Sequence, residues 1–512
     1  MALRRQLSSL KLAEDREGIL RIGETKLQAL EKHLFQRYPS REWGTFFRFG
    51  YRRTTWGLAV SYVDSLLPEP GDLDRIPGLT RFNDQYSRRA FHAAAASPLA
   101  IGVVHSHPEG CLTYPSSLDD DMDSYFAREF SSYSQGAPYC SLILQRNAST
   151  GLTFTARIFD RGTWFSIDAL ISVGSTINRF RSELLDQPEV IPAYEPERER
   201  LQALLGIESA RRFRGASVGV IGASGTGSPA VHVLARSGIG DFVMVDPKRI
   251  APSNLERLHG STASDINQET APFKVEILRR LIEGINPEAT STTFAGNVLH
   301  DNVVDELLRC DVVLGCTDSQ HGRAALSDLA DLYLLPSMDV GVLLEGSRGR
   351  VTTQLIDCTI FSPELPCGFC GGKVDGVTLS HELMTEEEAL ARKTAAQEAA
   401  ARGEDPDQYW RGQKRQLHTV GYLTTIAGAI IAGFVEGWLT GTFATPHASF
   451  QFDFAQERMG VVVSPRERKE GCTCGTRQGW GDLASANRNV TLPPHWDRRA
   501  MLLHRSRAVR VA

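Results

Sequence analysis

The chain has 512 residues, 42% of them hydrophobic and 23% charged, and a formal net charge of −5 at pH 7. This length predicts about three domains of average size or two large ones, and the apolar fraction excludes a chain that is disordered throughout. The near balance of 56 basic and 61 acidic residues excludes the basic character typical of nucleic-acid-binding proteins, and nine cysteines are too few for a disulfide scaffold.

Two segments bear on where the protein resides. Residues 1–20 alternate charged and apolar residues and lack the continuous apolar run of a secretion signal. Tyr422–Val435 is apolar, but it is too short to span a bilayer, and its glycine and alanine content favours a buried helix. Together with an odd number of cysteines, these features predict a soluble cytoplasmic protein that binds neither membranes nor nucleic acid.

The composition along the chain predicts two domains joined by a linker. The first domain, residues 1–185, is expected to close with a helix over Thr163–Leu185. Residues 186–197 are rich in proline, which is typical of an exposed connector. The second domain is expected over residues 198–478, and residues 479–512 are expected to form a locally packed C-terminal appendage.

A candidate zinc site lies in the first domain. Residues 101–108 predict a buried strand ending in His105 and His107, whose side chains point to the same side because they are two residues apart. Asp119 follows a helix N-cap signal at Ser116 and would be the third ligand. Two histidines and one carboxylate leave a coordination position for water, as in catalytic zinc sites. Glu42, at the start of an apolar strand pattern, would be the general base.

This pattern resembles the JAMM (JAB1/MPN/Mov34) metalloprotease family over roughly residues 20–165. The residues that carry the resemblance are Glu42, His105, His107, Pro108, Pro115, Ser116 and Asp119. It implies an α/β zinc hydrolase that cleaves peptide or isopeptide bonds after the C-terminal glycine of ubiquitin-like proteins. Glu42 would be the acid/base and Ser116 would stabilise the oxyanion. Because Asp120 and Asp121 follow directly, the choice of Asp119 rests on the Ser-x-x-Asp register alone.

A candidate nucleotide site opens the second domain. A β-branched run, Ala216–Ile221, leads into a turn containing Gly222, Gly225 and Gly227, and a helical stretch follows. Such a turn lets the backbone approach phosphates at a helix N-terminus. The next predicted strand ends in Asp246, where an acid that binds ribose hydroxyls is expected.

Residues farther along the chain distinguish this site from that of a dehydrogenase. Asn254, Arg257 and Lys274 would hold a triphosphate, and Asp318, after an apolar strand predicted over Asp311–Leu314, would hold Mg²⁺. Phosphoryl or adenylyl transfer requires such charge-neutralising groups and a metal, whereas hydride transfer does not.

The set resembles the ThiF/MoeB/ubiquitin-E1 adenylation domain over roughly residues 195–475. The resemblance implies a doubly wound, Rossmann-like α/β fold and ATP-dependent activation of the C-terminal glycine of a ubiquitin-like protein as an acyl-adenylate. It also implies a homodimer in which Arg200 reaches the nucleotide of a partner subunit. Ser224 stands where the family has glycine; we expect it to reduce backbone freedom, and either to offer a hydroxyl to a phosphate or to weaken ATP binding.

Four cysteines form two closely spaced pairs, Cys367 with Cys370 and Cys472 with Cys474. Four thiolates suit a structural zinc ion, and a thioredoxin-like redox pair is the alternative. Between the pairs lies a helix-favouring insertion, Glu386–Trp410, which is either a surface excursion or a lid that docks a partner.

That insertion contains no cysteine, whereas ubiquitin-type E1 enzymes carry their thioester cysteine after the zinc pair. We therefore expect the adenylate to pass to a separate carrier, either an E2-like cysteine or a sulfur source. The alternative is that Cys358 or Cys111 serves as the thiol.

Together the two resemblances imply a dual enzyme that adenylates a ubiquitin-like protein and also processes or deconjugates it. A bacterial-type conjugation pathway is the first hypothesis. The alternative is activation and processing of a sulfur-carrier protein for cofactor or amino-acid biosynthesis. A third hypothesis, a non-enzymatic scaffold with degenerate sites, is opposed by the complete ligand sets.

Overall fold

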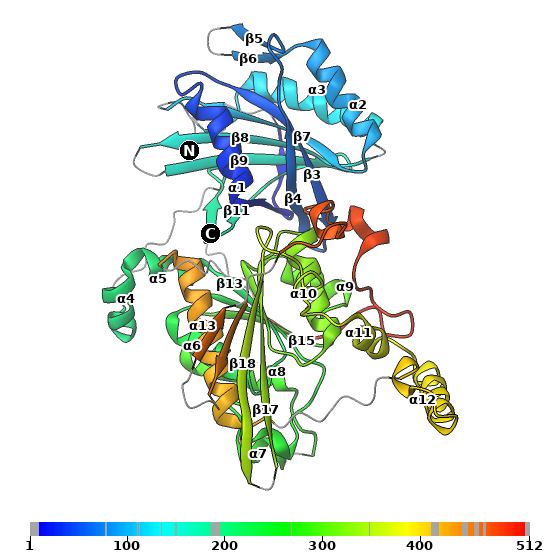
Figure 1. Ribbon diagram of the computed structural model, residues 1–512. Helices are drawn as coiled ribbons and strands as arrows, with labels where there is room; N and C mark the ends of the chain where they lie inside the picture. The colour runs from blue at the N-terminus through cyan, green and yellow to red at the C-terminus, as the bar shows by residue number, and fades with distance from the viewer. Residues whose placement is uncertain are drawn as a thin grey trace. The chain divides into compact units, whose positions relative to one another are not determined.

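The computed structural model describes residues 10–506, except 77–78, 110, 112, 135, 149–150, 186–194, 268, 348, 411–418, 443–448, 455–459 and 464–466. The chain divides into two compact units (Figure 1). Unit 1 comprises residues 1–190, 331–334 and 476–487, and unit 2 comprises residues 191–330, 335–475 and 488–512. Most of the expected linker, 186–197, lies outside the described residues.

Unit 1 is built on a mixed sheet that has ten strands in its described part, in the order β1-β10-β9-β8-β7-β3-β4-β2-β11-β12. These strands are β1 (Leu12–Ala13), β2 (Glu17–Gly23), β3 (Gly44–Arg53), β4 (Gly57–Leu66), β7 (Ala100–His107), β8 (Tyr139–Asn147), β9 (Gly151–Asp160), β10 (Thr163–Ser166), β11 (Ala169–Val173) and β12 (Ile177–Arg181). A separate hairpin consists of β5 (Leu73–Ile76) and β6 (Leu79–Phe82). The helices are α1 (Glu24–Glu31), continued by a π-helical turn (Lys32–Gln36), α2 (Asp84–Ala96) and α3 (Ser117–Tyr133).

The two faces of this sheet carry separate hydrophobic cores. Val104 belongs to the core that includes α1, whereas Val103 belongs to the core that includes α2 and α3. Strand β7 is buried along its whole length, and alternation along the strand puts His105 and His107 on the same side as Val103. Both histidines therefore face the side of the sheet that carries α3.

The helix predicted over Thr163–Leu185 is wrong, because this segment forms strands β10, β11 and β12. All five residues of β11 are buried, and β11 pairs in parallel with β2 and antiparallel with β12. Short apolar runs do not reveal from periodicity whether they form a helix or a strand. Here the pairing with β2, far away in the sequence, determines the structure.

Unit 2 contains a sheet of nine strands among its described residues, in the order β20-β19-β18-β17-β16-β13-β14-β15-β21. The strands are β13 (Ser217–Ile221), β14 (Asp241–Val245), β15 (Thr290–Ala295), β16 (Val312–Gly315), β17 (Ser337–Ser347), β18 (Arg350–Phe361), β19 (Ser449–Asp453), β20 (Gly460–Val463) and β21 (Met501–Arg505). The helices are α4 (Glu199–Leu205), α5 (Ile207–Gly215), α6 (Gly227–Ser237), α7 (Ala263–Ile266), α8 (Lys274–Ile285), α9 (Asp301–Leu307), α10 (Gln320–Leu332), α11 (Gly376–Glu382), α12 (Glu386–Ala401) and α13 (Gly421–Thr440).

The parallel part of this sheet has the predicted doubly wound, Rossmann-like character. Strand β13 pairs in parallel with β14 on one side and with β16 on the other, and β15 and β17 continue the parallel pairing outward. The strands predicted around residues 216–221, 241–246 and 311–314 are confirmed. The chain thus reverses direction across the sheet at β13, and ligands of such folds bind at the carboxyl ends of the strands beside that point.

The C-terminal residues differ from the expected local appendage. Residues 476–487 belong to unit 1, whereas β21 joins the sheet of unit 2 by antiparallel pairing with β15. A five-residue strand whose partner lies about 200 residues earlier leaves no local signal of its pairing.

Helix α13 confirms the predicted apolar helix but is longer than Tyr422–Val435. By length and composition, it is the one helix among the described residues that could cross a membrane. Within unit 2 it contacts α5, α6 and β17, and 56% of its apolar window is buried, which is also typical of a core helix.

Candidate functional site

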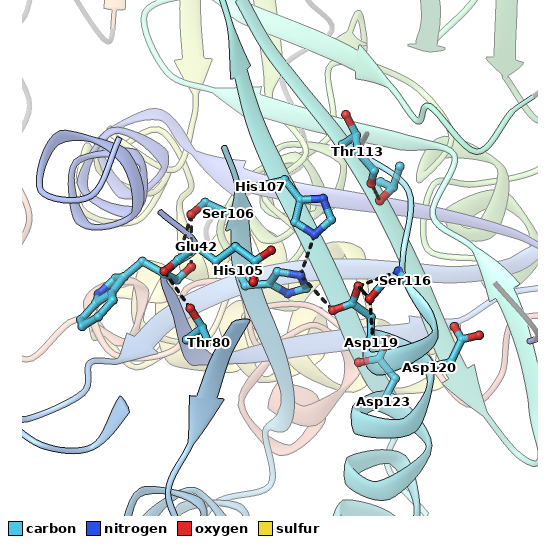
Figure 2. A network of polar contacts seen from close by, with 12 residues as sticks. Glu42, Thr80, His105, Ser106, His107, Thr113, Ser116, Asp119, Asp120 and Asp123 are labelled. Carbon is cyan, nitrogen blue, oxygen red and sulfur yellow. Dashed lines mark hydrogen bonds and ion pairs between the residues drawn. The ribbon is translucent and has the colours of Figure 1, made fainter. Parts of the chain in front are cut away.

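Three predicted ligands converge at the end of β7 (Figure 2). The Nε2 atoms of His105 and His107 lie 3.3 Å apart, and His105 Nε2 lies 3.3 Å from Asp119 Oδ1. Tetrahedral zinc with bonds of about 2.0–2.1 Å separates its ligand atoms by roughly 3.3 Å. The donor atoms and their spacing therefore fit a zinc ion.

The first turn of α3 determines how Asp119 is oriented. Ser116 is the N-cap of this helix, and its backbone N–H and hydroxyl donate to Asp119 Oδ2 at 2.6 and 2.7 Å. The other carboxylate oxygen, Oδ1, is the one near His105. Asp120 instead pairs with Arg157, and Asp121 is exposed. Of the three consecutive aspartates, only Asp119 joins the histidines.

Ser116 was predicted as the N-cap signal and as an oxyanion donor, but its hydrogen bond that positions the Asp119 carboxylate was not predicted. Hydrogen bonds to a ligating carboxylate fix its orientation and tune the metal site. The signal was present in the sequence, because a serine followed three residues later by an acid is a capping-box pattern.

Glu42 directly precedes the segment that leads into β3, and it lies beside His105 (Figure 2). Its backbone carbonyl accepts a hydrogen bond from the Thr80 hydroxyl on β6, at 2.7 Å. Burial raises the pKa of the Glu42 carboxyl, the nearby His105 lowers it, and the Asp119 carboxylate raises it again, with a net rise. A carboxyl with a raised pKa beside a metal site suits an acid/base role.

A buried charge network behind the metal site was not predicted. Arg157 on β9 is 2% exposed and donates to Asp123 Oδ2 at 2.8 Å and to Asp120 Oδ1 at 2.5 Å. The Tyr139 hydroxyl donates to the other oxygen of Asp123 at 2.8 Å. These contacts fix α3, and with it Asp119, against the sheet.

The glycine-rich turn after β13 requires glycine at two positions. Gly222 has a φ of +96°, and a Cβ there would lie 2.4 Å from the Cys316 carbonyl oxygen. A Cβ on Gly227 would lie 2.0 Å from the Gly222 oxygen, and one on Gly225 would lie 3.0 Å from Arg257 Cδ. The turn is therefore packed tightly against its neighbours before α6 begins.

Ser224, expected to reduce backbone freedom, stands at a position that does not require a positive φ. Among the described residues other than glycine, only Arg161 and Leu334 have a positive φ. The Ser224 carbonyl accepts hydrogen bonds from the backbone N–H and hydroxyl of Ser228 at 2.9 and 2.7 Å. The residue thus closes the first turn of α6.

Three of the predicted nucleotide residues, Asp246, Arg257 and Asp318, lie near Lys274, the first residue of α8. Burial lowers the pKa of Lys274, Asp246 and Asp318 raise it, and Lys248 and Arg257 lower it, with a net fall. Four charged side chains therefore lie close enough to Lys274 to shift its pKa, beside the carboxyl edge of the parallel sheet.

Two of the predicted nucleotide ligands also hold the local backbone. The Asp246 carboxylate accepts the N–H groups of Ala223 and Lys248 at 2.9 and 2.8 Å. Asn254 is buried, and its Oδ1 accepts the N–H of Ala251 at 3.0 Å.

Arg200 lies on α4, beside a hollow of about 400 Å³ that Arg236 also lines. Its expected contact with a partner subunit's nucleotide stays a prediction.

The four paired cysteines form one cluster, as expected. The Sγ atoms of Cys367 and Cys472 lie 3.6 Å apart, and those of Cys370 and Cys474 lie 3.8 Å apart. Zinc–sulfur bonds of about 2.3 Å separate tetrahedral ligands by about 3.8 Å, whereas a disulfide needs about 2.05 Å. The cluster fits a structural zinc better than a redox pair.

Two of the remaining cysteines are poorly suited to be nucleophiles. Burial raises the pKa of the Cys316 and Cys358 thiols, and nearby aspartates raise both further. A thiol that stays protonated is a weak nucleophile, which argues against Cys358 as the thioester residue. Cys111 is exposed.

Comparison with known proteins assigns unit 2. The family model described as the ThiF family matches residues 197–474, more than half of the chain. The adenylyltransferase and sulfurtransferase uba4 of Aspergillus clavatus is 30% identical over 173 residues, which are 33% of this chain and 32% of that protein. The SAMP-activating enzyme E1 of Haloferax volcanii is 28% identical over 166 residues, which are 32% of this chain and 57% of that protein.

The chain thus spans less than two thirds of the length of these curated relatives. Among solved structures, E. coli MccB with ATP is similar with a TM-score of 0.40 and 14% identity, covering 56% of this chain and 76% of that one. The match of the family model over residues 197–474 shows that the chain belongs to the ThiF family.

Proposed function

We propose that unit 2 uses MgATP to adenylate the C-terminal carboxylate of a ubiquitin-like or sulfur-carrier protein. The observation that carries this proposal is the grouping of Asp246, Arg257, Lys274 and Asp318 at the carboxyl edge of the parallel sheet, beside the glycine-rich turn. The two cationic side chains suit the phosphates of a nucleoside triphosphate, and the two carboxylates suit its ribose and its metal ion.

In the proposed reaction, a carboxylate oxygen of the carrier attacks the α-phosphorus of ATP, and pyrophosphate leaves with the electrons of the broken P–O bond. Arg257 and Lys274 neutralise the charge that develops on the phosphates. Asp318 would hold Mg²⁺, which when bound supplies further charge neutralisation. Asp246, already fixed by two backbone N–H groups, has lone pairs left for ribose hydroxyls.

The sulfur-carrier alternative has more support than the conjugation hypothesis. The names of the fungal relatives join adenylyltransferase to sulfurtransferase activity. The chain has no cysteine between Cys370 and Cys472, so an acyl-adenylate would be consumed by an external nucleophile. A sulfur donor is the simplest such nucleophile. Transfer to an E2-like protein and homodimerisation remain proposals without a structural observation of their own.

A second candidate function rests on the geometry of His105, His107 and Asp119 beside Glu42. We propose that unit 1 is a JAMM-like zinc peptidase that cleaves after the C-terminal glycine of the same carrier. Bound zinc would polarise the scissile carbonyl and acidify the attacking water. Glu42 takes the proton of that water and passes it to the leaving amine as the C–N bond breaks. The product is the free glycine carboxylate that unit 2 would activate.

ATP–pyrophosphate exchange tests the adenylation proposal. Wild-type protein with a carrier that ends in glycine should exchange label between pyrophosphate and ATP, and Asp318→Ala should abolish this exchange. Asp407→Ala, at an exposed position of the insertion, should leave it unchanged. Absence of carrier-dependent exchange in the wild type would overturn the proposal. Mass spectrometry after addition of a sulfur donor then separates a thiocarboxylate product from a conjugate.

A further inference from the structure

His321, at the start of α10, joins two distant parts of unit 2. Its Nδ1 lies 2.8 Å from Glu382 Oε2, and its backbone N–H donates to the same oxygen at 3.0 Å. On the other side of the ring, Nε2 lies 2.9 Å from the amide nitrogen of Asn297. Each side chain thus contacts the next, in the order Glu382, His321, Asn297.

The direction of each hydrogen bond follows from the chemistry of the partners. Asn297 Oδ1 accepts the N–H of Leu299 at 3.3 Å, which leaves the Asn297 amide nitrogen as the atom facing His321. An amide nitrogen only donates, so His321 Nε2 accepts and Nδ1 carries the proton that is donated to Glu382. The His321 ring is therefore hydrogen-bonded on both sides.

This chain of hydrogen bonds from Glu382 through His321 to Asn297, called the relay below, begins on α11, just before the insertion, and ends at the carboxyl edge of the sheet. Glu382 is the last residue of α11, whereas Asn297 comes two residues after β15. His321 comes three residues after Asp318, in the segment that follows β16. A second link lies beside the first, because the Asp375 N–H at the start of α11 donates to Gln320 Oε1 at 3.0 Å.

The relay is largely buried, and its Glu382 carboxylate is ionised. The side chains of His321 and Glu382 are 15% and 14% exposed, and Trp496 packs edge-on against the His321 ring at 5.6 Å. Burial raises the pKa of Glu382, but the hydrogen bonds from His321 outweigh it and lower the pKa to about 2. An ionised carboxylate therefore accepts hydrogen bonds at the N-terminus of α10, where a negative charge is favourable.

We propose that Glu382 and His321 are positioning residues that couple α11, and through it the neighbouring insertion, to the nucleotide site. The loops after β15 and β16 lie at the edge of the sheet where a nucleotide would bind, and His321 contacts one loop and follows the other. A ligand that fixes these loops also fixes α11 through Glu382. His381, next to Glu382, stacks on Trp410 at the end of the insertion at 4.4 Å. The insertion, left open between a surface excursion and a lid, thus becomes a nucleotide-sensitive element. This inference rests on the proposed adenylation function.

The test uses the full-length protein and MgATP alone, so that no carrier is needed. In the wild type, MgATP should slow amide hydrogen exchange within α11 and α12. Glu382→Gln should remove this protection and weaken MgATP binding by about tenfold or more, because the segment at the nucleotide site loses a charged hydrogen-bond partner that holds it in place. Glu387→Gln, in the exposed first turn of α12, is the matched control and should behave as the wild type.

A double-mutant cycle distinguishes loss of the contact between Glu382 and His321 from poor folding of a single variant. If Glu382 and His321 act as one relay, combining Glu382→Gln with His321→Gln should weaken MgATP binding hardly more than either change alone. Additive effects, or undiminished MgATP-dependent protection of α11 in Glu382→Gln, would overturn the inference and leave the adenylation proposal intact. A wild-type protein that does not bind MgATP would overturn the adenylation proposal itself.

Discussion

Ser116 and Asp119 hydrogen-bond to each other across the first turn of α3, and this pairing leaves a single oxygen of Asp119 facing His105. The helix cap and the metal site therefore share one carboxylate. Its two oxygens have separate tasks, because Oδ2 closes the helix and Oδ1 is available to the metal ion.

Asp119→Ala is expected to lower the zinc content of the purified protein by one equivalent per chain. Its carboxylate would be the third ligand of the proposed zinc ion, and two histidines alone hold zinc weakly. Asp121→Ala, two residues along the same helix and exposed, should retain the wild-type zinc content. Metal analysis of the two variants checks this, and equal zinc loss in both would show that the Ser-x-x-Asp register misidentifies the ligand.

Ser116→Ala should weaken both the helix and the metal site. Loss of the N-cap costs about 1 kcal/mol of stability, and loss of a hydrogen bond to a ligating carboxylate lowers metal affinity about 10–100-fold. Competition with a zinc chelator measures the affinity, and Ser117→Ala, at the exposed next position, is the control. If Ser116→Ala retains full zinc affinity, its hydroxyl does not position Asp119.

Cys370→Ser should remove the other zinc ion and lower the melting temperature of unit 2. The cluster joins residues more than 100 positions apart, so its metal ion stabilises the fold by binding the folded state alone. Cys111→Ser, at an exposed free cysteine, should change neither zinc content nor melting temperature. A Cys370→Ser protein with unchanged zinc content would rule out the structural zinc.

The buried carboxyl of Asp328 should make the stability of the protein fall as the pH rises. Burial raises the pKa of its carboxyl to about 6, against hydrogen bonds from Asn489 and Val490 that lower it. The folded state therefore binds this proton more tightly than the unfolded state, whose pKa is near 3.9. The stabilisation is complete below about pH 4 and is lost as the pH rises through about 6, by up to about 3 kcal/mol.

Calorimetry of wild-type protein and Asp328→Asn between about pH 4 and pH 7 checks this dependence. The stability of the wild type relative to the variant should fall across that range. A difference that is constant, or that grows with pH, would contradict the raised pKa.

Helices, strands and candidate site residues can be predicted from the sequence where the same short segment carries both the hydrophobic pattern and the reactive side chains. The His-x-His spacing on a strand places both rings on one side, and the glycine-rich turn has no room for side chains at Gly222 and Gly227. These patterns depend only on neighbouring residues, so they can be recognised without knowledge of the tertiary structure.

Features that depend on distant partners could not be predicted in this way. Residues 163–185 became strands because β2 and β12 pair with β11, and Arg157 is buried because Asp120 and Asp123 surround it. The contact between His321 and Glu382 spans 61 residues. In each case the stabilising partner lies outside any local pattern.

Our main proposal is that one chain first exposes a C-terminal glycine and then activates it. It is tested most directly by ATP–pyrophosphate exchange with a carrier supplied in two forms, one ending in glycine and one extended beyond it. We predict that the wild type exchanges with both forms, that Glu42→Gln exchanges only with the form ending in glycine, and that Asp318→Ala exchanges with neither. Exchange by Glu42→Gln with the extended form, or no exchange by the wild type with the form ending in glycine, would contradict the account.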